Sequence, residues 1–140
     1  MTVKASLWDS VMDAAAEEDF SMLSPEDFFE APSECYYLAG QGIGNGAHCR
    51  AVAEDFFGVM VQQHHYPKFI VLMDEAVGFL RRTDPLCAVF SELEKNGTTV
   101  CASAVSMALY GWEDEIDRNF AESTATIMDI LRVSDKVISL

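Results

Sequence analysis

Along residues 33–140, short apolar runs alternate with segments whose apolar residues recur at helical spacing. The run FIVLM at 69–73 is uninterrupted, which is typical of a parallel strand buried on both faces. Strands are predicted at 35–39, 69–73, 98–102 and 136–140, and helices at 47–62, 83–96, 103–111 and 119–132. This alternation predicts an α/β sandwich with a mainly parallel sheet.

Each predicted helix should bury one apolar stripe against the sheet. For the helix at 47–62 we expect the stripe to be Cys49, Val52, Ala53, Phe56, Val59 and Met60. For 83–96 it should be Leu86, Val89, Phe90 and Leu93, and for 119–132 it should be Phe120, Thr124, Ile127 and Leu131. The segment AVGFL at 76–80 is expected to form a short extra strand or an extended loop.

The first 32 residues are predicted to form a helical arm that precedes the α/β domain of residues 33–140. Apolar residues recur at helical spacing over residues 4–20, so this stretch should be an amphipathic helix. A second, short helix should begin at Ser24, which is followed by a proline and two acids. Two arrangements remain open: the arm packs on its own domain, or it packs on a neighbouring subunit.

The charge of the chain limits its partners. The net charge is −14, from 9 basic and 23 acidic residues. An acidic surface repels nucleic acid and anionic membranes, so we expect neither as a partner. No apolar run approaches the roughly 18 residues that a membrane span needs, and no signal peptide is recognisable. We therefore expect a cytoplasmic protein.

The four cysteines are expected to be free thiols that are mostly buried. They are Cys35, Cys49, Cys87 and Cys101, and no two of them form a CxxC pair. The three histidines are not spaced with them as zinc ligands would be. The sequence therefore predicts no metal site and no cofactor.

Three loops should converge at the carboxyl edge of the sheet, where chemistry gathers in open α/β folds. They span residues 40–46, 74–77 and 102–106. The first has the pattern GxGxGxG, which is neither the dinucleotide fingerprint nor a P-loop. Its backbone N–H groups could hold an anion or a nucleotide at Gly42, Gly44, Asn45 and Gly46. The simpler interpretation is a tight turn that needs positive φ.

The other two loops carry polar side chains. Asp74 and Glu75 could act as acid and base, although a solvated strand end is the simpler interpretation. Ser103 and Ser106 could cap the following helix or donate a hydrogen bond. Cys101 precedes this loop, inside the predicted strand, and its thiol would need a helix N-terminus to become reactive.

The order of these segments resembles a known family. The strand leading into GQGIGNG, then YPKFIVLMDEAV, LCAVFSELEKNGTTVCAS, a helix reaching YG, and a terminal DKVISL resemble the DsrE/DsrF/TusD-like family, especially the DsrE-like domain of YedF-type proteins. The resemblance covers about residues 34–140. It implies a flavodoxin-like three-layer sandwich, assembly into dimers, trimers or hexamers, and a possible sulfur-relay partner protein.

The resemblance also implies where sulfur would be carried. Members of the family hold a persulfide on a cysteine just after the strand that corresponds to 98–102, and YedF-like members often have CxxC there. Counting back from Gly111, the matching stretch here is Ser103-Ala104-Val105-Ser106, so serines replace both cysteines. Cys101 lies two residues earlier, on the same strand face but closer to the core.

The function expected from the sequence is a DsrE-like protein associated with sulfur metabolism, oligomeric and without thiol chemistry. Two alternatives remain. One is a sulfurtransferase that carries its persulfide on Cys101. The other is an anion or nucleotide binder that uses the glycine turn.

Overall fold

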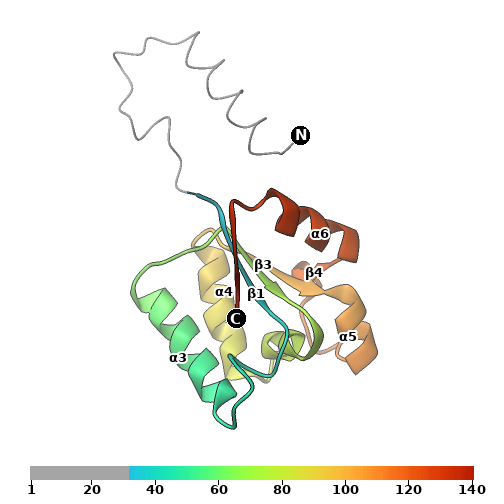
Figure 1. The fold of residues 1–140 in the computed structure, drawn as a ribbon. Helices are drawn as coiled ribbons and strands as arrows, with labels where there is room; N and C mark the ends of the chain where they lie inside the picture. The colour runs from blue at the N-terminus through green and yellow to red at the C-terminus, as the bar shows by residue number, and fades with distance from the viewer. Residues whose placement is uncertain (1–31) are drawn as a thin grey trace, which may run out of the picture. The chain divides into compact units, whose positions relative to one another are not determined.

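The computed structural model describes residues 32–140 (Figure 1). The predictions for the N-terminal arm, namely the helix at 4–20, the helix start at Ser24 and the packing of the arm, lie outside the described residues. The described part is an α/β domain in which helices cover both faces of one sheet.

The sheet has five strands in the order β4-β3-β2-β1-β5. Every pair of neighbouring strands is parallel. The predicted flavodoxin-like α/β sandwich with a parallel sheet is therefore confirmed. Its strand order differs from the order 2-1-3-4-5 of flavodoxin itself, because β5 lies beside β1 at the edge of the sheet. The strands are β1 (Glu34–Leu38), β2 (Phe69–Leu72), β3 (Thr99–Ser103), β4 (Ala121–Glu122) and β5 (Lys136–Ser139).

The sheet divides the core into two parts, and helices cover each of them. The longer ones are α3 (Cys49–Gln62), α4 (Pro85–Lys95) and α6 (Thr124–Val133), and the shorter ones are η2 (Asp74–Leu80), α5 (Ala104–Tyr110) and η3 (Arg118–Phe120). Apolar side chains of α3 and α4 fill the larger core on one sheet face. On the other face, α6 packs over a smaller cluster that includes Cys35, Val71 and Cys101.

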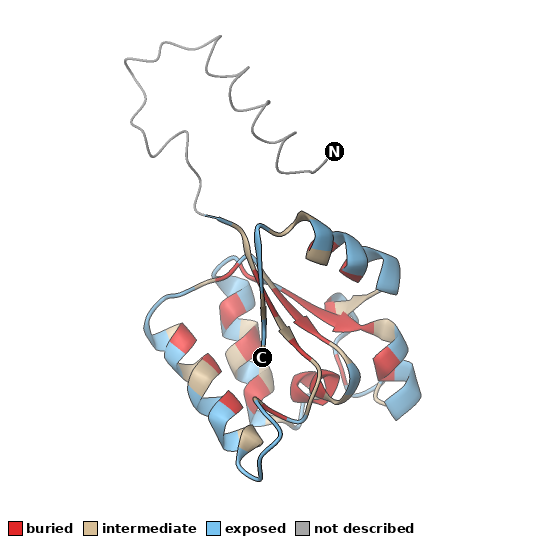
Figure 2. Cartoon of the chain, viewed as in Figure 1, coloured by how far each residue is buried: buried red, intermediate tan, exposed pale blue. Residues whose placement is uncertain are grey.

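The buried face of α3 differs from the predicted one. Ala53, Phe57 and Met60 are buried, whereas Val52 and Val59 are 47% and 36% exposed (Figure 2). The ring of Phe57 lies 4.8 Å from that of Phe90 on α4, centroid to centroid. The larger aromatic ring takes the core position, because it buries more apolar area than a valine does. The buried face of α3 is therefore rotated by about one residue relative to the predicted face.

Two further segments differ from prediction. The AVGFL segment lies in the 3₁₀ helix η2, which is neither a strand nor an extended loop, and its five residues are buried. The helix predicted at 119–132 begins only at Thr124, where the Ser123 hydroxyl caps it by accepting a hydrogen bond from the Thr126 N–H at 3.2 Å. The residues before it form η3 and β4, because Ala121 and Glu122 pair with the end of β3. Thr124 is consequently exposed.

Candidate functional site

The loops that follow β1, β2 and β3 meet at the carboxyl edge of the sheet, as the parallel topology predicts. The side-chain amide of Gln41 donates a hydrogen bond to the carboxylate of Glu75. The backbone N–H of Asp74 donates to the hydroxyl oxygen of Ser106 at 2.9 Å. The side chains of Gln41, after β1, and Ser106, in α5, therefore hold the start of η2 between them.

Asp74 has an unusual backbone conformation at this edge. Its φ is +51°, in the left-handed region that non-glycine residues rarely adopt. The Ser106 hydroxyl accepts the hydrogen bond of its N–H, and the Tyr110 hydroxyl donates to its Oδ1 at 2.6 Å. The bond to Asp74 raises the pKa of Tyr110 to about 12, with smaller contributions from desolvation and from the charges of Asp74 and Glu75. These contacts fix the carboxylate in one place.

Ser103 and Ser106, on either side of the junction between β3 and α5, make structural hydrogen bonds. Ser103, the last residue of β3, caps α5: its hydroxyl oxygen accepts a hydrogen bond from the Ser106 N–H at 3.1 Å. Ser106 in turn accepts from Asp74. Both serines are buried, at 2% and 8% exposure. Their hydroxyl groups hold α5 and the loop after β2 in position.

Cys101 lies away from this edge cluster, in the core under α6. Its side chain is 1% exposed, beside Val71 and Ile127. Burial raises the pKa of Cys101 to about 12, and the nearby Glu122 carboxylate adds to the effect. Burial also raises the pKa of Cys35, to about 11. Neither thiol is ionised near neutral pH, so neither has the character of a sulfur nucleophile.

The glycine turn braces the start of α3. A Cβ atom on Gly42 would lie 2.1 Å from the carbonyl oxygen of Cys49, so only glycine fits there. The backbone N–H of Ile43 donates to the same oxygen at 3.0 Å, and Gly44 has a φ of +80°. Gly44, Asn45 and Gly46 are exposed at the tip of the turn. The turn therefore has a structural role, whether or not an anion also binds there.

An open cleft of about 480 Å³ lies beside the three linked loops. Its volume falls in the range of known ligand sites, about 300–1,000 Å³. We call it the carboxyl-edge cleft. It is lined by Gln41, Arg50, Glu75, Gly78, Phe79, Arg81, Asp84, Tyr110 and Trp112.

Stacked side chains form one wall of the carboxyl-edge cleft. The rings of Tyr110 and Trp112 lie 4.7 Å apart at an interplanar angle of 14°. The guanidinium carbon of Arg81 lies 4.4 Å from the centre of the Trp112 ring. Gly78 permits this packing, because a Cβ there would come within 2.9 Å of the indole.

The carboxyl-edge cleft contains a second arginine, Arg50, which already has carboxylate partners. Arg50 binds the carboxylate of Asp84 with both terminal nitrogens, one of them at 2.8 Å, and its Nε binds Glu54 at 3.0 Å. The bond to Asp84 raises the pKa of Arg50 further above its usual value. Asp84 also caps α4 by accepting from the Leu86 N–H at 2.9 Å. Arg50 is therefore held in place, and the two carboxylates more than balance its charge.

Of the residues proposed from sequence, only Glu75 lines the carboxyl-edge cleft. Asp74, Ser103 and Ser106 support its walls from behind, and the tip of the glycine turn does not line it. The arginines and aromatic residues of the cleft were not foreseen. One signal was present: the helix that follows β3 ends in Tyr-Gly-Trp, which places two large rings just beyond the carboxyl edge.

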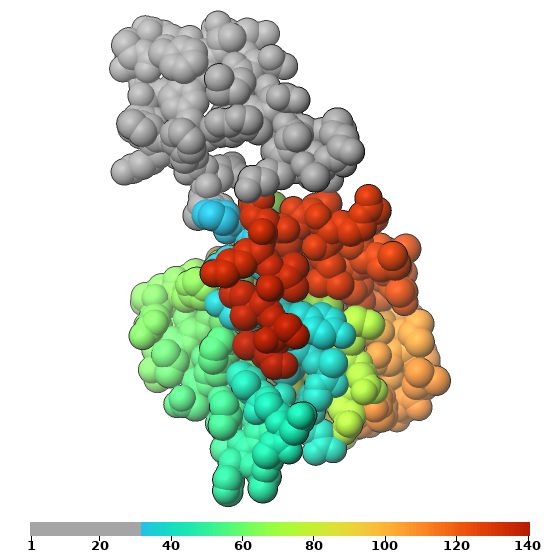
Figure 3. All heavy atoms as spheres, viewed as in Figure 1, coloured from blue at the N-terminus to red at the C-terminus, as the bar shows by residue number. Residues whose placement is uncertain are grey.

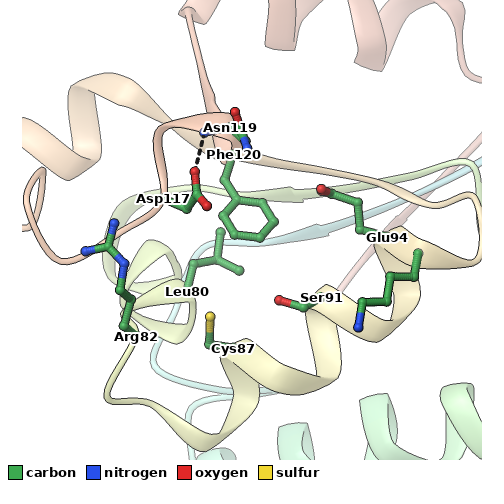
Figure 4. A pocket seen from close by; sticks show the side chains of 9 residues that line it. Leu80, Arg82, Cys87, Ser91, Glu94, Asp117, Asn119 and Phe120 are labelled. Atoms are coloured by element: carbon green, nitrogen blue, oxygen red, sulfur yellow. Dashed lines mark hydrogen bonds between the residues drawn. The ribbon is translucent and has the colours of Figure 1, made fainter.

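A second cleft, of about 350 Å³, lies along α4 (Figure 4). Cys87 and Ser91 face it from the helix, opposite Leu80 and Phe120. Its charged residues have both signs, and one of them, Asp117, accepts a hydrogen bond from the Asn119 N–H at 2.9 Å. No side chain that the sequence singled out as a site residue lines it, so we place the candidate site at the carboxyl edge.

Residues 32–140 contain neither a cluster of metal-ligating side chains nor a helix that could span a membrane. No group of three or more His, Cys, Asp or Glu side chains in this range is placed to hold a metal ion. No helix within it has the length and apolar character that crossing a membrane requires.

Comparison with known proteins finds a structural relative of this chain. No family model matches the chain, and no curated protein matches it. Among solved structures, the ychN protein of E. coli is similar, with a TM-score of 0.58 and 12% identity. The match covers 79% of this chain and all of the ychN chain. This likeness shows that the two proteins share a fold.

Proposed function

We propose that this chain is a DsrE-like protein associated with sulfur metabolism, which binds a small molecule in the carboxyl-edge cleft and carries no persulfide. The observation that supports the proposal best is the use of Ser103 and Ser106. Both stand where the family resemblance implies sulfur-carrying cysteines, and both hydroxyl groups hold α5 and the Asp74 loop in place. A hydroxyl cannot form a persulfide.

The cleft supports a binding role because its walls are preorganised. Stacking and hydrogen bonds fix Trp112, Tyr110 and Arg50 before any ligand enters. Preorganised walls reduce the entropy that is lost on binding. In keeping with the family resemblance, we propose that the protein acts in the cytoplasm as a homo-oligomer and that it meets a protein of a sulfur relay.

A fluorescence screen tests the binding role. The chain has two tryptophans, so a Trp8→Phe variant leaves Trp112 as the reporter in the cleft. The screen would use a library of small metabolites that includes sulfur-containing amino acids, thiosulfate and sulfite. We expect at least one compound to change Trp112 emission and raise the melting temperature, since a ligand specific to the native state stabilises it. A screen without any such compound at millimolar concentration would refute the binding role.

The alternative, a sulfurtransferase that uses Cys101, requires an accessible thiolate. Alkylation of the native protein distinguishes this alternative from the proposed binding role. Mass spectrometry would locate each modified cysteine. We expect Cys101 to react slowly until the protein unfolds, because it is 1% exposed and has a raised pKa. Fast alkylation of native Cys101 near neutral pH would instead favour sulfur transfer.

A further inference from the structure

We propose that the carboxyl-edge cleft binds a small zwitterion of the α-amino acid type, with its carboxylate on Arg81 and its ammonium group on Glu75. This inference rests on the proposed binding function and specifies the ligand class. It follows from two charged side chains of the cleft, Arg81 and Glu75, that have donor or acceptor atoms left for a ligand.

Arg81 is the cleft cation that has no carboxylate partner among the described residues. Its Nε donates to the carbonyl oxygen of Gly78 at 3.2 Å, and its guanidinium plane stacks on Trp112. No ion pair or hydrogen bond is made by its two terminal nitrogens within residues 32–140. A guanidinium held in this way presents a fork of donors that matches a carboxylate. Arg50, by contrast, already binds Asp84 and Glu54.

Glu75 supplies the complementary charge. It is half-buried, and Gln41 donates to its Oε2. Its Oε1 accepts no hydrogen bond from any described residue, so it can accept one from an ammonium group. Asp74, the next residue along the chain, adds a second negative charge on this side of the cleft, and the Tyr110 hydroxyl holds its carboxylate.

The charge of the whole chain favours a neutral ligand over an anion. At −14 the protein repels anions at long range, and this repulsion opposes the binding of a ligand that has a carboxylate alone. A zwitterion has no net charge, yet it can pair with both groups. The partly exposed rings of Tyr110 and Trp112 offer a surface for an apolar or aromatic side chain.

Calorimetric titration of the full chain with L-phenylalanine and two derivatives tests the assignment. Phenylalanine amide lacks the carboxylate, and N-acetylphenylalanine lacks the ammonium group. We expect L-phenylalanine to bind and each derivative to bind at least tenfold more weakly, since each loses one charge-assisted contact. These comparisons use the unmodified protein, so no variant has to fold for them to be informative.

Variants then locate the contacts. Arg81→Gln should weaken L-phenylalanine binding at least tenfold, and Glu75→Gln should also weaken it. Arg118→Gln is the matched control, because Arg118 is exposed on η3 and does not line the cleft. It should bind like the unmodified chain.

The outcomes separate the inference from the binding role. The zwitterion assignment is overturned if L-phenylalanine does not bind, if a derivative binds as tightly, or if Arg81→Gln binds like the control. In each of these cases a compound from the metabolite screen that still changes Trp112 emission would leave the binding role intact. If no compound changes it, the binding role fails together with the assignment.

Discussion

At the scale of single residues, the candidate site depends on close approaches that only particular side chains allow. Gly42 touches the backbone of α3, and Gly78 lies against the indole of Trp112. The contact at Gly42 is with a carbonyl group in the first turn of a helix, which cannot move without unwinding that turn. The cost of a substitution should therefore differ sharply between glycines of the same turn.

Gly42→Ala should lower the free energy of unfolding by about 1–3 kcal/mol, the usual cost of overpacking. Gly46→Ala is the matched control, since a Cβ there meets nothing within 4 Å and the residue has no positive φ. It should be close to neutral. Urea denaturation of both variants measures the difference, and equal midpoints would contradict the assigned role of Gly42.

Cys101 should make the protein sensitive to alkali. Its pKa is raised from 9.0 to about 12 in the folded state, so the folded state holds the thiol proton more tightly than the unfolded state does. The contribution of the Cys101 thiol to the free energy of unfolding is therefore fully present below pH 9, and it is lost as the pH rises toward 12. Cys101→Ala should therefore show a shallower loss of stability between pH 8 and pH 11 in urea titrations. Cys87→Ala, on the partly exposed face of α4, is the control. If the free energy of unfolding falls equally with pH in the unmodified chain and in both variants, Cys101 is not the source of the alkali sensitivity.

At the scale of elements, the sequence predicts strands better than it predicts helix faces. Continuous apolar runs such as FIVLM identify the central strands, and their parallel pairing brings the three loops together. The face of α3 is ambiguous, because Phe56, Phe57 and Val59 are all apolar and only packing against α4 selects Phe57. β4 is two residues long, too short to leave a periodic signal.

The contacts within the candidate site are likewise harder to predict from the sequence than its location. Its location follows from topology, but the pairing of Arg50 with Asp84 joins residues 34 positions apart. The stacking of Arg81 on Trp112 likewise depends on the 3₁₀ geometry of η2, for which the sequence pattern gave no evidence.

The orientation of α3 can be tested directly. Phe57→Ala should lower the free energy of unfolding by about 3–5 kcal/mol, because it leaves a cavity beside Phe90. Val59→Ala should change it by about 0.5 kcal/mol or less, since Val59 is 36% exposed. Urea denaturation provides both values, and a larger loss for Val59→Ala would indicate the face that the sequence predicted.

At the scale of the whole molecule, residues 32–140 cover the sheet face under α6 less completely than the face under α3 and α4. Tyr37, Phe69 and Met73 are only partly buried there, and Val137 on the edge strand β5 is 45% exposed. Figure 3 shows β5 at the surface beside β1. Parallel sheets are normally covered on both faces, so we propose that copies of the chain in the proposed homo-oligomer meet at this face.

Val137→Lys should weaken that assembly, because it places a charge in the proposed apolar contact. Sedimentation equilibrium over a range of protein concentrations would measure the mass. Val52→Lys, at the exposed side of α3 on the other sheet face, should leave the mass unchanged. The proposal would be wrong if the unmodified chain is monomeric at every concentration, or if both variants behave alike.

The hydrogen bond between Ser106 and Asp74 also bears on how such a protein changes over evolution. Because the Asp74 N–H depends on a hydroxyl oxygen as its acceptor, a cysteine at position 106 would do more than introduce a thiol. Sulfur accepts hydrogen bonds weakly, so Ser106→Cys would weaken the contact that holds this backbone at positive φ. Acquiring a thiol at this position would therefore lower the stability of the fold in the same step.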